Sequence, residues 1–191
     1  MSAGPSVSLA ADDSNDPVHV VQSFEETLVS VMKNAEQLGY PGRYEQLSAS
    51  ARASHDFQTI ARVSVGKFWK QLENDQQNRL VDTFTELSVA TYADRFARYS
   101  GERFKIVSQR RFGKDRALVR SVMSKPGGKK RNFDFMLKRF DGVWKIVNIT
   151  VNGVSDLAVK RIEFQSVIEE SGFDALMVRL REKIARYEAG S

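Results

Sequence analysis

The sequence predicts an α+β fold in which a four-stranded antiparallel meander packs under helices that precede and follow it. Three observations lead to this prediction. Apolar residues recur every three or four positions up to about residue 99 and again after residue 153, which is typical of amphipathic helices. Between these regions the apolar period changes to two, which is typical of strands. The links between the four resulting runs are short and carry turn residues, so neighbouring strands should run antiparallel.

The first half of the chain is predicted to be helical. A helix should begin at Asp16-Pro17, because aspartate accepts hydrogen bonds from free amides and proline at the first position loses no needed donor. It should run to about Gln37, after which Gly39 and Pro41-Gly42 interrupt the pattern. Further helical segments are predicted over residues 44–53, 57–72 and 76–99.

Four strands are predicted over residues 104–111, 117–124, 131–140 and 143–151. One face of the last two strands should pack under the helices, because alternate residues there are apolar: Phe133, Phe135, Leu137, Val147, Ile149 and Val151. The opposite face carries Lys138 and Asn148 together with Trp144 and Ile146, so we expect it to meet water at least in part. Two helices should follow, up to residue 171 and over 173–187.

The length of 191 residues favours a single domain with flexible ends, which we place at residues 17–188. Residues 1–16 are small and polar and are expected to form a disordered tail. Within it, Ser8-Leu9-Ala10 has the small-x-small form of a signal-peptidase site, which indicates the remnant of a signal peptide; an ordinary polar tail is the alternative. No apolar run approaches the ~18 residues of a membrane-spanning helix.

Positive charge is concentrated in the predicted sheet. Residues 95–145 contain sixteen Lys and Arg against four Asp and Glu, so this stretch carries +12 and the rest of the chain carries −7 of the net +5. The asymmetry indicates an anionic partner, such as a lipid headgroup, a membrane surface, an acidic protein or a nucleic acid. A solvated outer sheet face is the alternative interpretation. Nucleic acid is the least supported of these partners, because the predicted sheet lacks the dense aromatic ladder on which bases stack and Phe133 falls on the buried face.

Catalytic and metal-binding patterns are missing from the sequence. The absence of cysteine excludes disulfides, thiolate zinc sites and cysteine nucleophiles. His19 and His55 are the two histidines, and we interpret them as a surface residue and a helix-entry residue. No nucleophile elbow, phosphate loop or His-Glu-x-x-His pair occurs. We therefore predict no catalytic residue, no metal and no cofactor.

Several local strings, taken in order, resemble the MlaC (toluene-tolerance) family of periplasmic lipid-binding proteins over nearly the whole chain. These strings are Val65-Gly66-Lys67-Phe68-Trp69-Lys70, Tyr92-Ala93-Asp94-Arg95-Phe96, Asp141-Gly142-Val143-Trp144-Lys145-Ile146, Gly153-Val154-Ser155 and Gly172-Phe173-Asp174-Ala175-Leu176. Two more are similar to the hopanoid-associated HpnM branch: Leu38-Gly39-Tyr40-Pro41-Gly42-Arg43-Tyr44 and Tyr99-Ser100-Gly101-Glu102-Arg103-Phe104.

The resemblance implies a periplasmic carrier with a fold like nuclear transport factor 2, in which helices and sheet enclose an apolar pocket. Such a carrier takes a hopanoid, phospholipid or fatty acid between an outer-membrane lipid complex and an inner-membrane transporter, and touches membrane surfaces transiently. The alternatives from other classes are a small-molecule enzyme with such a pocket and an interaction module for an acidic partner.

The candidate lining residues are those whose helix or strand face should point inward, although each could also be ordinary core. They are Phe57, Ile60, Phe84, Leu87, Phe96, Val107, Val119, Phe133, Phe135, Val147, Ile149, Val151, Val154 and Leu157.

Overall fold

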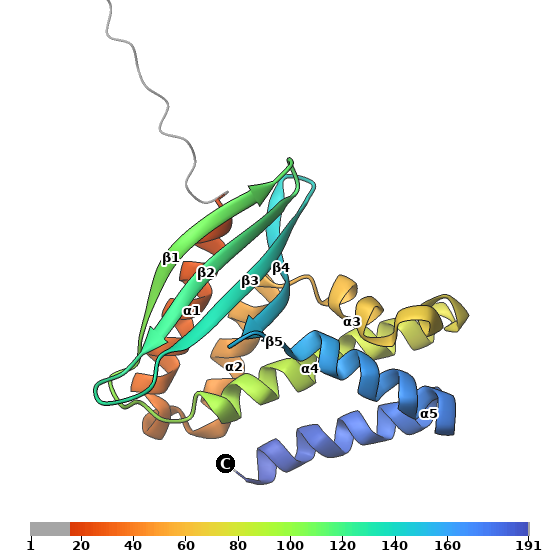
Figure 1. Ribbon diagram of the computed structural model, residues 1–191. Coiled ribbons are helices and arrows are strands. Elements are labelled where there is room, and N and C mark those ends of the chain that lie inside the picture. Colours follow the sequence, from red (N-terminus) through yellow and green to blue (C-terminus); the bar gives the residue numbers. More distant parts are fainter. Residues whose placement is uncertain (1–15, 191) are drawn as a thin grey trace, which may run out of the picture.

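The computed structural model describes residues 16–190, so the predicted tail, apart from Asp16, lies outside the described residues. Figure 1 shows a long, curved sheet with helices against it and beside it. The helices are α1 (Pro17–Lys33), α2 (Ala35–Ser54), α3 (Phe57–Val65), the 3-10 helix η2 (Gly66–Gln71), α4 (Asn74–Arg95) and α5 (Asp156–Ala189). The strands are β1 (Arg103–Phe112), β2 (Arg116–Ser124), β3 (Arg131–Phe140), β4 (Val143–Val151) and β5 (Val154–Ser155).

The start of α1 is as predicted, but its end is not. Asp16 caps the helix, since its Oδ1 accepts a hydrogen bond of 2.9 Å from the Val18 amide. The helix ends at Lys33 instead of Gln37, and α2 begins at once and continues past Pro41. The expected break at Gly39 is a kink within α2, where φ is 57°. Pro41 is tolerated because it lies just after the kink, where a missing amide donor leaves no hydrogen bond unmade.

The predicted antiparallel meander is confirmed. The strand order is β1-β2-β3-β4-β5, and each neighbouring pair is antiparallel. The two-residue strand β5 was not predicted, and it joins the end of β4 to the start of α5. Both tight turns at residues 113–115 and 141–142 lie at one end of the sheet, because Arg116 of β2 pairs with Lys138 of β3.

One prediction about the sheet faces is wrong. The register of β3 against β4 shifts, so that Phe135 pairs with Ile149 whereas Leu137 pairs with Ile146. The extra residue, Val147, is a β-bulge that turns the preceding side chains to the other face. As a result Trp144 and Ile146 are 2% and 0% exposed on the helix-covered side, and not on the water-facing side.

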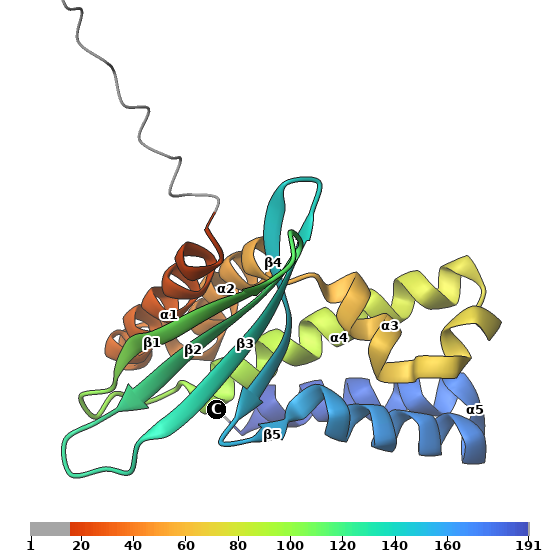
Figure 2. The same ribbon diagram turned by 45° about the horizontal axis from the view of Figure 1, so that its top comes forward.

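The helices form two groups, which meet where α2 packs against α4 and where helices of both groups contact β4. Helices α1 and α2 lie behind the sheet, whereas α3, α4 and α5 lie together beside its β4 edge (Figures 1 and 2). Helix α5 folds back on itself at Gly172, where φ is 83° and a side chain would be strained. Among residues 16–190 one continuous apolar core joins the groups, with Phe24 of α1, Phe135 of β3 and Phe164 of α5 fully buried.

Candidate functional site

A small cavity with a mostly apolar lining lies where β4, α3, α4 and α5 meet. Its volume is about 50 Å³. Six of the predicted lining residues surround it: Phe57, Ile60, Phe84, Val147, Ile149 and Leu157. They are joined by His55, Ser88, Tyr92, Ile146, Asn148 and Asp156. A water molecule in the liquid occupies roughly 30 Å³. The cavity is therefore too small for a lipid tail unless the surrounding elements move apart.

The other predicted lining residues lie elsewhere. Leu87, Val119, Phe133 and Phe135 are buried in the core, and Phe96 and Val151 pack against it partly buried. Val107 and Val154 are 54% and 60% exposed, so their expected inward orientation is corrected. Val107 is the extra residue of a bulge in β1, which turns its side chain outward, and Val154 lies on the two-residue strand β5.

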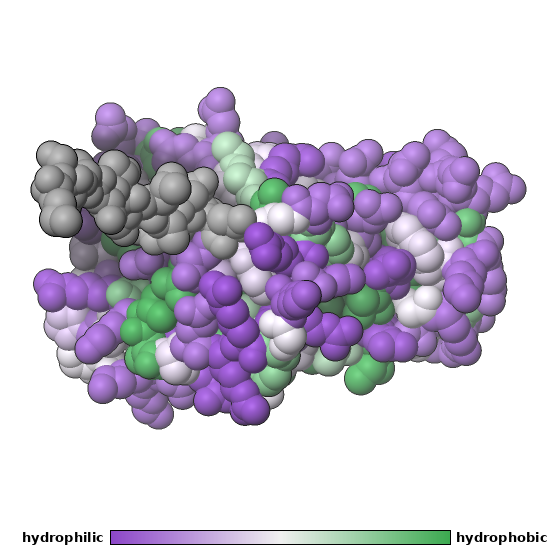
Figure 3. Space-filling model, turned by 90° about the horizontal axis from the view of Figure 1, so that it is seen from above, coloured by the Kyte–Doolittle hydropathy of each residue, from purple (hydrophilic) through white to green (hydrophobic). Residues whose placement is uncertain are grey.

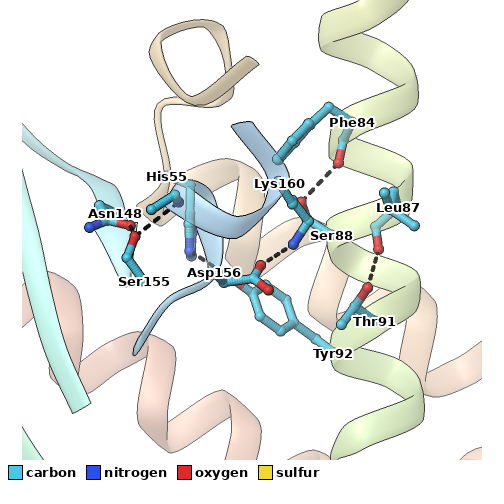
Figure 4. A network of polar contacts seen from close by, with 11 residues as sticks. His55, Phe84, Leu87, Ser88, Thr91, Tyr92, Asn148, Ser155, Asp156 and Lys160 are labelled. Carbon is cyan, nitrogen blue, oxygen red and sulfur yellow. Dashed lines mark hydrogen bonds and ion pairs between the residues drawn. The ribbon is translucent and has the colours of Figure 1, made fainter. Parts of the chain in front are cut away.

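His55 forms a polar wall of the cavity. Burial lowers the pKa of its ring to about 4, so the ring is neutral. Its Nδ1 lies 3.2 Å from the Ala51 carbonyl oxygen, which requires a donor, so we assign the proton to Nδ1. Its Nε2 then accepts a hydrogen bond from the Tyr92 hydroxyl at 3.2 Å. Burial raises the pKa of Tyr92, which keeps that hydroxyl protonated. Figure 4 shows the two side chains pointing toward each other.

Four further polar residues line or border the cavity. Asp156 forms an ion pair with Lys160 within the first turn of α5. The Ser155 hydroxyl donates a hydrogen bond of 2.9 Å to Asn148 Oδ1 and thus joins α5 to β4 (Figure 4). Burial lowers the pKa of Lys160, and Asp156 opposes this shift. Lys160 Nζ also lies 5.9 Å from the centre of the Phe84 ring, so a cation stands at the edge of the apolar lining.

His55 and Asp156 both line the cavity but do not form an acid–base pair. Both His55 nitrogens have hydrogen-bonding partners, and the Asp156 carboxylate pairs with Lys160. Within residues 16–190 no group of three or more His, Asp and Glu side chains could hold a metal ion. Sequence reasoning missed this polar wall because its residues come from four separate segments and share no motif.

Glu25 of α1 is a buried carboxyl away from this cavity. It is 4% exposed and faces Ser121 of β2, and neither Glu25 Oε1 nor Ser121 Oγ has a hydrogen-bond partner within the described residues. Burial raises the pKa of Glu25 to about 7, and the smaller effect of the neighbouring Ser121 hydroxyl lowers it. The charged side chains that share its groove between α1 and β1 are Glu26, Lys33, Glu102, Arg103 and Lys105.

Glu25→Gln is expected to stabilise the protein at pH 8 and to have little effect at pH 5. The folded-state pKa is higher than the unfolded one, so the contribution of Glu25 to stability falls as pH rises from about 4.5 to 7. Above pH 7 the ionised Glu25 carboxylate lowers the free energy of unfolding by an amount on the order of 2–3 kcal/mol. Urea unfolding at both pH values measures it, with the exposed neighbour change Glu26→Gln as the control. The same gain at pH 5 and pH 8 would contradict a titrating carboxyl.

Comparisons with known proteins identify relatives of this chain. A profile of the MlaC protein family matches residues 22–182. Among solved structures, the phospholipid-binding protein from Ralstonia solanacearum, determined in complex with a phospholipid, has a TM-score of 0.79 to this chain. The two are 21% identical, and the match covers 92% of this chain and 99% of the other. A search of curated proteins gives no significant match.

The similarity to the Ralstonia protein shows that the fold is shared. Over residues 16–190, no helix combines the length and apolar character needed to cross a membrane. The family match spans most of the residues, including every residue that lines the cavity. The chain therefore belongs to the MlaC family, whose proteins are periplasmic lipid carriers and not enzymes.

Proposed function

We propose that this chain carries a single lipid by enclosing its apolar tail between β4 and the helices α3, α4 and α5. The observation that supports this most is the small cavity between β4 and these three helices, which is lined by apolar side chains and by polar ones such as His55 and Asp156. Family membership and the phospholipid bound to the Ralstonia protein agree with this proposal. Exposed apolar surface costs roughly 25 cal/mol per Å² in water, which is the cost that such a carrier removes.

Lipid uptake requires the cavity to widen, and its surroundings suit this. The contacts between β4 and the neighbouring helices are partly polar, namely the Ser155–Asn148 hydrogen bond and the 3.0 Å bond from the Asp56 amide to the Ile146 carbonyl oxygen. Ile149 and Leu157 are only half-buried. Separating such elements costs less than opening a fully buried core, so the tail should enter here while Phe135 and Leu137 stay packed.

Membership in the MlaC family supports a route and a class of cargo. Residues 17–188 would act as one unit that moves between an outer-membrane lipid complex and an inner-membrane transporter. A phospholipid is the first candidate, and a hopanoid is the second because of the strings around Tyr40 and Tyr99 that resemble the HpnM branch. The face shown in Figure 3 is mainly hydrophilic. The basic stretch 95–145 would bring the carrier to anionic membranes or to an acidic partner, and salt should weaken that contact.

Native mass spectrometry of the purified protein tests the proposal. We expect a complex with one lipid bound per chain, and solvent extraction of the same sample would tell a phospholipid from a hopanoid or a fatty acid. Protein that arrives empty should be incubated with phospholipid vesicles and measured again. A chain that remains free of lipid after this incubation would contradict the carrier function.

A further inference from the structure

A second cavity lies next to the first, on the other side of the start of α3. Its volume is about 630 Å³, and it opens between the end of α2, helix α3 and the paired ends of β3 and β4. His55 lines both cavities, so they are immediate neighbours. We call it the cationic cavity, because it is lined by Arg52 of α2, Arg62 of α3, Lys138 of β3 and Lys145 of β4.

These four cations have no anionic partner among the described residues. None of them forms an ion pair with any residue in 16–190. The one acid in the lining is Asp56, and its Oδ1 caps α3 by accepting a hydrogen bond of 3.3 Å from the Thr59 amide. The cavity therefore has an excess of positive charge that the described part of the chain leaves uncompensated.

The sheet register adds to this excess. Lys138 lies directly opposite Lys145 on one side and directly opposite Arg116 on the other. Like charges in facing positions of neighbouring strands destabilise a sheet. Lys145 Nζ is held by the Ala53 carbonyl oxygen, and Lys138 Nζ lies 4.9 Å from the centre of the Phe140 ring. Neither contact neutralises a charge, so a bound anion would relieve the repulsion.

The size and the walls of the cavity favour an organic phosphate. Arginine and lysine together suit the oxygens of a phosphate group, to which charge-assisted hydrogen bonds are strong. The rings of Trp69 and Phe140 and the polar groups of Gln58 and Thr59 provide walls for an attached organic part. The volume exceeds what an inorganic ion requires.

We propose that the cationic cavity binds the phosphate group of an anionic ligand. If the proposed lipid carriage holds, this phosphate belongs to the headgroup of the carried lipid, whose tail occupies the neighbouring apolar cavity. His55 then stands between headgroup and tail as a neutral wall. The other source of the same chemistry is a free phosphate or phosphate ester, and the experiment separates the two.

The double variant Arg52→Gln/Lys138→Gln tests the assignment. Its matched control is Lys129→Gln/Lys130→Gln, which removes the same charge at the opposite end of the sheet. Calorimetry would measure binding of inorganic phosphate and of glycerol 3-phosphate, and extraction would measure phosphatidylglycerol taken up from vesicles. We expect the cavity variant to lose about tenfold or more in affinity for glycerol 3-phosphate and to take up less lipid, because two charge-assisted hydrogen bonds are lost. The control should match the wild type.

The outcomes are distinct. If both double variants weaken glycerol 3-phosphate binding equally, overall charge alone attracts the anion. This result would overturn the proposed binding site. Weaker glycerol 3-phosphate binding with unchanged lipid uptake would overturn the headgroup assignment and support a free phosphate ester. A wild-type protein that takes up no lipid would refute the proposed lipid carriage. The phosphate titration would still show whether the cationic cavity binds a phosphate group. If circular dichroism shows the double variant to be unfolded, the exposed single change Arg62→Gln replaces it.

Discussion

Ile149→Asn is expected to remove most of the bound lipid while the fold is retained. Ile149 lies on β4, is half-buried and lines the apolar cavity. An asparagine amide there would face the lipid tail without a hydrogen-bond partner, at a cost of about 1–3 kcal/mol. Such a cost lowers affinity about tenfold to a hundredfold. The protein should still fold, because the side chain belongs to the border of the core and not to its fully buried centre.

The measurement compares the lipid extracted per chain from the wild type and the variant, with circular dichroism as the check on folding. Thr150→Asn is the matched control, since Thr150 is the next residue on the same strand and pairs with Asp134 on the opposite face. It should leave the lipid content unchanged. A native Ile149→Asn protein with a full complement of lipid would show that this position does not contact the tail.

The largest loss of stability is expected from Phe24→Ala. Phe24 of α1 is fully buried, and its ring meets the rings of His55 and Tyr92 edge-on, with centroids 4.9 Å and 5.4 Å away. Truncating such a ring removes its apolar contacts and leaves a cavity, which costs about 3–5 kcal/mol. That is a large part of the 5–15 kcal/mol that typically holds a domain together.

Urea unfolding of the purified variants gives the free energy of unfolding directly. Phe24→Leu serves as the control, because it keeps much of the buried volume and should cost distinctly less than alanine. Equal losses for leucine and alanine would argue that the aromatic contact with His55 and Tyr92 carries the stability. A loss below 1 kcal/mol for alanine would contradict the packing described for α1.

The architecture could be predicted from periodicity because each element keeps its period over many residues. The change near residue 100 from a helical period to a period of two separates the helices from the sheet, and glycine-containing turns separate the strands. The bulge at Val147 could not be predicted. It adds a single residue, so apolar and polar residues still alternate on either side of it, but the side chains before it change to the other face of the sheet. Alternation alone therefore places Trp144 and Ile146 on the wrong face.

The site was only partly accessible to sequence reasoning. Apolar members such as Phe57 and Ile149 were proposed because their faces point inward, and that rule depends on local pattern alone. The polar wall at His55 and Tyr92 depends on a contact between residues 37 positions apart, which no local pattern encodes. Likewise the charge of +12 over residues 95–145 was visible, but the convergence of Lys138 and Lys145 with Arg52 and Arg62 requires the fold.

The outer edge of β1 bears on how the protein behaves at high concentration. Among the described residues, β1 pairs with β2 alone, so its other side offers backbone amides and carbonyls to any strand that arrives. The bulge at Val107 breaks the regular spacing that such a strand would need, and Arg103, Lys105 and Arg110 would meet the same charges on a second copy. Crowded molecules should therefore repel each other at this edge and resist stacking into aggregates.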